Sequence, residues 1–361
     1  MDRRQLVGAL LVATSALGYA SGPLLAKGVY ATGTDWLALL AWRFTLAGLL
    51  TWGWIATSTS GRAALRRLTR HQAIVLIGLG MVFAGNATTY YAAIQFAPVS
   101  LVALLLYVYP ALVAVGAMRL GRPFEGRRAW IALGIAVAGA VFTVDGIDTS
   151  ARPVGVALAI ASPVIYAGYI LLAARASGER RPSETEQRTW AEPPGPSGAA
   201  RWMEPGSAGS GGSGPRVAQA GPAVPAGGRR AAVSAVPPLL AAALMLFGTW
   251  LVIIVIAVAA GERVLPGQIP AGAWPGLAGI AVFATAVAIQ AFYAGVSRLG
   301  AARAALVSTL EPVFTVTLAV LLLGERLAPL QMLGGALVVA AVLLAQTGRA
   351  APVDVVVERE A

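Results

Sequence analysis

The residue best placed to do chemistry is Glu311, which stands near the middle of a long apolar stretch, directly before Pro312. An ionised carboxylate inside a membrane is costly, so we expect Glu311 to be protonated, paired, or exposed to a wet cavity. Pro312 has no N–H, and therefore leaves a backbone carbonyl near Ser308 without its helical donor. This pair predicts a proton- or cation-responsive site. The alternative is a neutral glutamic acid that only hydrogen-bonds between helices.

The corresponding place in the first half of the chain holds Tyr109, directly before Pro110. Tyr107 lies two residues earlier, about 200° around a helix, so the two tyrosines do not share a narrow face. We expect Tyr109, beside the proline kink, to line a cavity. We expect Tyr107 to pack between helices.

Neutral polar and aromatic side chains follow other apolar segments. Asn86 and Tyr90 are four residues apart and share one helical face. Gln290 occupies the related segment of the second half, and Tyr166 overlies Tyr19 in the two segments that open the halves. These residues predict a neutral, aromatic, hydrogen-bonding pocket for a small-molecule substrate. Hydrogen bonds that merely join packed helices are the alternative.

Arg43 is a basic residue about a third of the way into an apolar segment, within Trp42-Arg43-Phe44. At this depth an arginine side chain can extend outward to the membrane surface. The alternative is that Arg43 pairs with an anionic substrate group or with a carboxylate, which would give it a role in gating alongside Pro110, Glu311 and Pro312.

The composition assigns these residues to a membrane protein. The chain of 361 residues is 57% hydrophobic and 12% charged, with a mean hydropathy of +0.73, which is too apolar for a soluble protein. A membrane span takes roughly 20 apolar residues. The first segment could be a signal peptide, but it lacks a cleavage-type end, so we expect it to be retained. Ten segments qualify, at about 6–26, 36–56, 73–96, 98–118, 129–145, 154–174, 237–260, 273–297, 299–323 and 329–347.

Several kinds of chemistry are disfavoured by the residues present. With no cysteine and His71 as the one histidine, the chain offers no disulfide, thiolate metal site or histidine-based triad, so we expect no metal and no cofactor. A membrane-embedded enzyme is a poor alternative, because Glu311 has no second carboxylate or histidine at its depth. The Gly-rich stretch 206–214 lacks the Lys-Ser/Thr ending of a nucleotide-binding loop, which argues against transport driven by ATP.

The net charge of +11 follows membrane topology. If the N-terminus is cytoplasmic and ten spans alternate, 22 of the 27 lysines and arginines lie on the cytoplasmic side. We therefore predict cytoplasmic N- and C-termini, with the lipid bilayer and no nucleic acid as partner. Self-association as a homodimer is left open.

The chain repeats itself. Residues 91–110 return as 293–312 at an offset of 202, and residues 7–20 return as 154–167 at an offset of 147. The second repeat aligns the sixth span with the first, so each copy contains five spans. Because five is an odd number, the second copy has the opposite orientation in the bilayer. The predicted fold is therefore all-α, with ten transmembrane helices in two inverted five-helix repeats around a central cavity. The predicted parts are a first repeat at 1–150, the start of the second at 151–175, an insertion at 176–236, the rest of the second repeat at 237–348, and a cytoplasmic tail at 349–361.

The insertion 176–236 is rich in Gly, Pro, Ser, Arg and Glu, so it lacks the apolar surface needed to order itself. We predict a disordered cytoplasmic segment that the fold tolerates. The alternative is a docking segment anchored by Trp190 and Trp202, which would make the protein a non-transporting membrane sensor or assembly factor.

Three strings in this order resemble the EamA-type members of the drug/metabolite transporter superfamily. They are Trp42-Arg43-Phe44 followed by Ala47-Gly48, Leu106-Tyr-Val-Tyr-Pro110, and Leu310-Glu-Pro-Val-Phe314 leading to Leu323-Gly-Glu-Arg326. The resemblance covers the ten spans and excludes 176–236. It implies ten helices in two inverted repeats around a central cavity. It also implies secondary transport of amino acids, other small metabolites or drugs, often outward, across the bacterial inner membrane.

Within that family, the Leu-Glu-Pro-Val segment is most similar to threonine/homoserine-type exporters. The resemblance adds weight to Tyr109, Pro110, Glu311 and Pro312 and, more loosely, to Asn86, Tyr90 and Tyr166. We accordingly expect a secondary-active exporter by alternating access, with Asn86, Tyr90, Tyr109, Tyr166 and Gln290 on the substrate and Glu311 sensing protons or another coupling ion.

Overall fold

The computed structural model describes residues 3–119, 127–145, 152–176, 236–299, 304 and 307–347, and all regular elements within these ranges are helical. The insertion predicted at 176–236 and the tail at 349–361 lie almost entirely outside the described residues. The first half contains α1 (Arg3–Tyr30), α2 (Trp36–Thr57), α3 (Thr59–Arg67), α4 (Arg70–Phe96), α5 (Val99–Leu106), α6 (Tyr109–Arg119) and α7 (Arg127–Asp145). The second half contains α8 (Pro153–Ala176), α10 (Pro238–Ala259), the short turns η3 (Pro266–Gln268) and η4 (Ala271–Ala273), α11 (Trp274–Ala281), the π-helical turn η5 (Val282–Val287), α12 (Ala288–Leu299), α14 (Leu310–Leu323) and α15 (Pro329–Thr347).

The helices have the length and the surface of membrane spans. Six described helical stretches are long and apolar enough to cross a bilayer, and the shorter α14 and α15 are apolar as well. Large apolar side chains are turned outward, with Leu321 72% and Leu322 70% exposed. Such faces are a liability in water but match acyl chains. The prediction of an all-helical polytopic membrane protein is confirmed.

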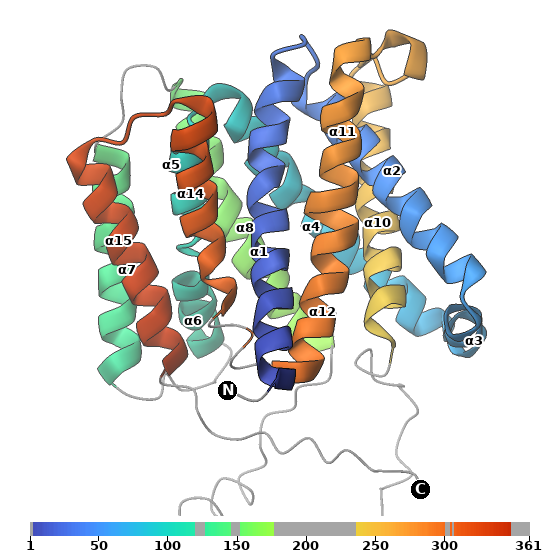
Figure 1. Cartoon of the computed structure of the whole chain (residues 1–361), viewed down its shortest axis with the longest axis horizontal. Coiled ribbons are helices and arrows are strands. Elements are labelled where there is room, and N and C mark those ends of the chain that lie inside the picture. Colours follow the sequence, from blue (N-terminus) through green and yellow to red (C-terminus); the bar gives the residue numbers. More distant parts are fainter. Residues whose placement is uncertain are drawn as a thin grey trace, which may run out of the picture. The chain divides into compact units, whose positions relative to one another are not determined.

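The two halves run in opposite directions. Near the end of α1, the Lys27 ammonium donates to the carbonyl oxygen of Ala97 at 2.9 Å. At the start of α8, the backbone N–H of Arg152 donates to the carbonyl of Phe96 at 3.0 Å. The end of α1, the end of α4 and the start of α8 therefore lie together at one end of the bundle. We call this the distal end, and the end at which α1 begins, marked N in Figure 1, the proximal end.

Helix packing obeys the expected twofold relation. Helix α1 packs on α12 and α14, and its counterpart α8 packs on α4 and on α5 and α6. The pairs α2–α10, α5–α14 and α7–α15 each join equivalent helices of the two halves, and Figure 1 shows α7 and α15 side by side. Each of these contacts has an equivalent contact when the two halves are exchanged, as the two sequence repeats predicted.

Local sequence signals fix where the spans begin. The Asp35 carboxylate accepts from the N–H of Leu37 at 2.9 Å and starts α2, while Thr69 and Gln72 form a capping box that starts α4. The connection between these helices, expected as a basic loop, contains the additional short helix α3, whose first turn is capped by Ser58. Its arginines stay at the proximal end, so the charge distribution is unchanged.

Gly80 lies at a point of close approach between α4 and α10. A Cβ built on Gly80 would overlap the carbonyl oxygen of Met245, and the Thr249 hydroxyl donates to the Gly80 carbonyl at 2.8 Å. Gly80→Ala should therefore push the helices apart and destabilise the fold by about 1–3 kcal/mol, the usual cost of overpacking. Thermal unfolding of the purified protein in detergent measures this.

Gly78, on the same helix, is the matched control for Gly80. A Cβ on Gly78 meets nothing within 4 Å, so Gly78→Ala should be neutral or slightly stabilising. Equal losses in melting temperature for the two variants would contradict the close-packing role of Gly80.

Candidate functional site

The fourth span is broken at the position that its proline predicted. Helix α5 ends at Leu106, residues Tyr107 and Val108 form a turn, and α6 begins at Tyr109 with Pro110 in its first turn. Tyr107 and Val108 donate from their backbones to carbonyls three residues earlier. The break leaves two tyrosines at the junction, at the middle of the span.

The ninth span is broken at the related position. Thr309 forms a turn and α14 starts at Leu310, so Glu311 and Pro312 occupy its first turn. Because α5 packs on α14, the two breaks face each other across the halves. The hydroxyl of Tyr107 is hydrogen-bonded to the Glu311 carboxyl group. A partly buried carboxyl of one half is thus held by a tyrosine of the other.

Tyrosines from three spans surround this pair. The rings of Tyr109 and Tyr166 pack edge to face, with their centroids 4.7 Å apart. The ring of Tyr166 also stacks on that of Tyr169, with a centroid separation of 5.9 Å. Glu311 is close enough to interact electrostatically with Tyr90, Tyr109 and Tyr166. The structure therefore brings together three of the tyrosines and the carboxylate that the sequence selected.

Asn86 is buried beside this cluster and connects two spans of different halves. Its side-chain oxygen accepts a hydrogen bond from the Ser162 hydroxyl at 2.8 Å, and both side chains are buried. This contact agrees with helix-packing polarity, the alternative stated above. A direct role for Asn86 on the substrate stays a prediction.

Arg43 points into the protein. Its guanidinium carbon lies 4.7 Å from the centre of the Tyr91 ring and 5.4 Å from that of Phe44. The Arg43 Nε is buried and has no hydrogen-bond partner among the described residues. The favoured expectation of an outward-extending arginine is therefore wrong, because the guanidinium lies against the Tyr91 ring of the neighbouring helix α4.

Gln290 is the selected residue that the structure leaves apart. It lies on α12, which packs on α1, and no interaction within the described ranges joins it to the tyrosine cluster. The same span contains the π-helical turn η5, which Ala288 follows directly. The Ser15 hydroxyl of α1 donates a hydrogen bond of 2.7 Å to the carbonyl oxygen of Ala288. Such turns often mark functional sites. The turn Leu299-Gly300 falls partly outside the described residues.

A second polar group lies at the distal end, around Glu325 in the segment that follows α14. One carboxylate oxygen accepts from the N–H of Val99 at 2.7 Å, and the other accepts from the N–H and the hydroxyl of Ser100 at 3.0 and 2.6 Å. Glu325 of the second half thereby caps the first turn of α5 in the first half.

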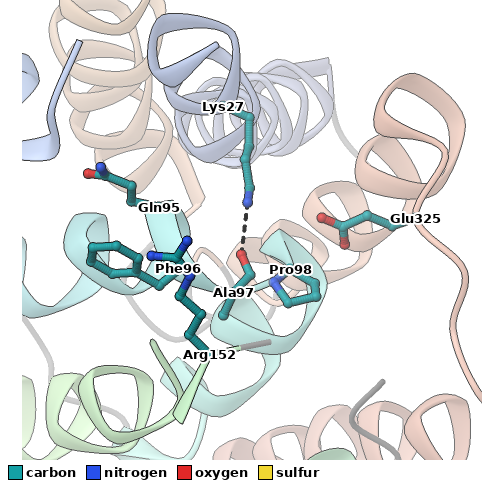
Figure 2. Close-up of a pocket in the computed structure, with 7 residues that line it drawn as sticks. All are labelled: Lys27, Gln95, Phe96, Ala97, Pro98, Arg152 and Glu325. Atoms are coloured by element: carbon teal, nitrogen blue, oxygen red, sulfur yellow. Dashed lines mark hydrogen bonds between the residues drawn. The ribbon is translucent and has the colours of Figure 1, made fainter. Parts of the chain in front are cut away.

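Beside this cap is a cavity of about 410 Å³, shown in Figure 2. Its wall combines two cations, the carboxylate and the distal end of α4: Lys27, Gln95, Phe96, Ala97, Pro98, Arg152 and Glu325. We call it the distal vestibule. No group of three or more potential metal-binding side chains occurs in the described ranges.

Comparison with known proteins identifies the family. The model of the EamA-like transporter family matches residues 6–145 and 226–347, which is most of the chain and one copy per half. The chain belongs to the EamA-like transporter family. It is accordingly a multi-pass membrane transporter of the drug/metabolite transporter superfamily, with a small-molecule substrate and membrane lipids as its surroundings.

Other comparisons are consistent with the EamA-like fold. One solved structure, described as "Crystal structure of protein", shares 16% identity at a TM-score of 0.55, covering 94% of this chain and 96% of that chain. It is among 21 matching chains of known structure. At this identity the likeness concerns the fold alone. No curated protein matches the chain.

Sequence reasoning about this EamA-like chain missed three site residues. Tyr107 was expected only to pack between helices, and its contact with Glu311 was not anticipated. Glu325 was noted only as part of a family string, and Arg152 was not selected as a site residue. A carboxylate two residues after the end of the ninth span was a usable signal for Glu325. Nothing local signals Arg152, because its neighbours come from other helices.

Proposed function

We propose that this protein is a secondary-active carrier that exports a small metabolite, such as an amino acid or a drug-like amphipath, by alternating access. The observation that carries the proposal is the Glu311–Tyr107 hydrogen bond, made between two broken helices of opposite halves. Broken helices that meet near the middle of inverted repeats are a common build of substrate sites in secondary transporters.

The substrate would bind against the tyrosine cluster. Tyr109 and Tyr166 offer an edge-to-face aromatic wall with two hydroxyl groups, and Tyr90 extends the wall toward Arg43. Such a wall favours a cargo with an apolar body and a few hydrogen-bonding groups. In this proposal Asn86 and Gln290 are further polar contacts at the edges of the substrate site.

Glu311 would provide the coupling. When the carboxylate is ionised, the Tyr107 hydroxyl can donate to it, whereas a protonated carboxyl can itself donate elsewhere. Gain or loss of a proton, or of a bound cation, therefore changes a contact between the halves. A contact that differs between two states shifts their equilibrium, and Pro110 and Pro312 supply breaks at which the spans can bend.

The orientation follows from the charge distribution. The basic α3 and the N-terminus lie at the proximal end, which we place in the cytoplasm of a bacterium with the protein in the inner membrane. The distal vestibule then faces the outside.

A two-stage experiment tests this function. Purified protein is first screened by thermal shift against amino acids and amphipathic cations, because a ligand at about 100 times its Kd stabilises by about 2.7 kcal/mol. A radiolabelled hit is then followed in proteoliposome counterflow, with protein-free liposomes as the control. We expect saturable counterflow; binding without counterflow would contradict the carrier.

Deleting residues 178–234 separates the carrier from a sensor or assembly factor that works through the insertion. The two family matches lie almost entirely outside this segment, so we expect the deletion variant to melt within a few degrees of the full chain and to keep its counterflow. Loss of cellular phenotype with intact counterflow would assign the biological role to the insertion.

A further inference from the structure

The distal vestibule carries an inference that does not depend on Glu311. It lies where the ends of α1 and α4, the start of α8 and the segment after α14 meet, so both halves contribute to it. Figure 2 shows the Lys27 and Arg152 side chains approaching the Ala97 region from opposite sides, with Glu325 to one side. The charged groups of the distal vestibule differ in how many hydrogen bonds they already make within the protein.

The negative charge of Glu325 is directed into the protein. Its two oxygens accept three hydrogen bonds from Val99 and Ser100, at the positive end of α5. This carboxylate is therefore largely compensated before anything enters the vestibule, and the N-terminus of α5 is itself already occupied.

Among the residues that the structure describes, the two cations have donors without a partner. The Lys27 ammonium has three N–H groups and spends one on the Ala97 carbonyl. The Arg152 guanidinium lies over the Phe96 ring, 5.7 Å from its centre, and makes no hydrogen bond to any side chain that the structure describes. Stacking on an aromatic ring leaves the in-plane N–H groups of an arginine available for an oxyanion.

We propose that the distal vestibule is a binding site for the carboxylate or phosphate group of a small organic anion, held between Lys27 and Arg152. Lysine ammonium and arginine guanidinium groups are the usual partners of such groups. The volume of about 410 Å³ admits a molecule of metabolite size. The same chemistry would suit the phosphate of an anionic lipid, so the test distinguishes a soluble anion from a lipid.

The absence of native cysteines permits a direct test. Pro98→Cys puts a single thiol on the vestibule wall at a residue that has no N–H to lose. Its reaction rates with an anionic reagent (sulfonatoethyl methanethiosulfonate) and a cationic one (trimethylammonium-ethyl methanethiosulfonate) are compared in nanodiscs. Gly267→Cys, in the exposed turn η3, provides the reference for the same ratio.

We expect the anionic-to-cationic rate ratio at Pro98→Cys to exceed that at Gly267→Cys by about tenfold, in the range of electrostatic focusing in charged clefts. Adding Lys27→Gln or Arg152→Gln should each lower the ratio severalfold, while Lys27→Arg should preserve it. Equal ratios at the two cysteines, or a ratio unaffected by both glutamine variants, would overturn the proposal. Thermal unfolding checks that each variant is folded.

Occupancy is measured by protection. Millimolar succinate should slow modification of Pro98→Cys in phosphatidylcholine nanodiscs relative to sodium chloride at equal ionic strength. Protection by phosphatidylglycerol in the nanodisc, without succinate, would assign the same site to a lipid phosphate. Protection by neither, even with a raised rate ratio, would show a surface potential without a binding site and would refute the proposal. None of these readouts involves transport, so they stand apart from the test of the carrier.

Discussion

Replacing Glu311 by glutamine is expected to uncouple transport from the proton gradient. Glutamine keeps the shape and can still accept from Tyr107, but it cannot change charge. The contact between the halves then no longer depends on protonation. Allosteric coupling free energies are typically about 1–3 kcal/mol, so gradient-driven accumulation should fall roughly 5- to 150-fold. Counterflow, which needs no net coupling, should persist.

The measurement is uptake into inverted vesicles or proteoliposomes at several imposed pH gradients, with the substrate found by thermal shift. Glu262→Gln, in the distal connection after α10, is the matched carboxyl-to-amide control and should behave as the unaltered protein. Uptake by Glu311→Gln that follows the imposed gradient as before would remove the coupling role, while leaving carriage itself intact.

Replacing Glu325 by alanine is expected to cause the largest loss of stability. The substitution removes all three hydrogen bonds that Glu325 accepts and leaves the N–H groups of Val99 and Ser100 buried without partners. Each orphaned buried donor costs about 1–3 kcal/mol. The loss should appear as a clearly lower melting temperature in detergent. Glu325→Gln retains one acceptor oxygen, so its melting temperature should lie between those of Glu325→Ala and the unaltered protein.

Arg326 is the control for the Glu325 substitution, because it is the next residue and is exposed. Arg326→Ala should leave the melting temperature nearly unchanged. In a double-mutant cycle, Ser100→Ala should cost much less when Glu325 is already alanine, because residues in one network are not additive. Additive losses would show that Glu325 does not act through the start of α5.

Glu311 and Glu325 make different contacts between the two halves of the protein. Glu311 lies at the start of α14 and is held by Tyr107, whereas Glu325 follows the end of α14 and caps α5. Helix α14 is thus tied to the first half at both ends. In the proposed carrier only Glu311 contacts a hydroxyl whose bond depends on protonation, so coupling is assigned to it and structural closure to Glu325.

Much of the fold was readable from the sequence because its signals are local or repeated. The ten spans follow from apolar length, the inverted arrangement from two sequence repeats separated by an odd number of spans, and the central breaks from Pro110 and Pro312. The family assignment was likewise predictable and is confirmed. The roles given to the individual site residues stay predictions.

The tertiary structure decided which polar groups meet. The rotation of about 200° between Tyr107 and Tyr109 assumes a regular helix through both residues. The turn at Tyr107 and Val108 ends that helix, so Tyr107 reaches Glu311. The inward direction of Arg43 depends on the Tyr91 ring of another span. The distal vestibule joins residues as far apart as Lys27 and Glu325. Apolar periodicity reports which face of a helix meets lipid, but the partner of a polar side chain is set by how helices from both halves cross, and no single segment encodes that.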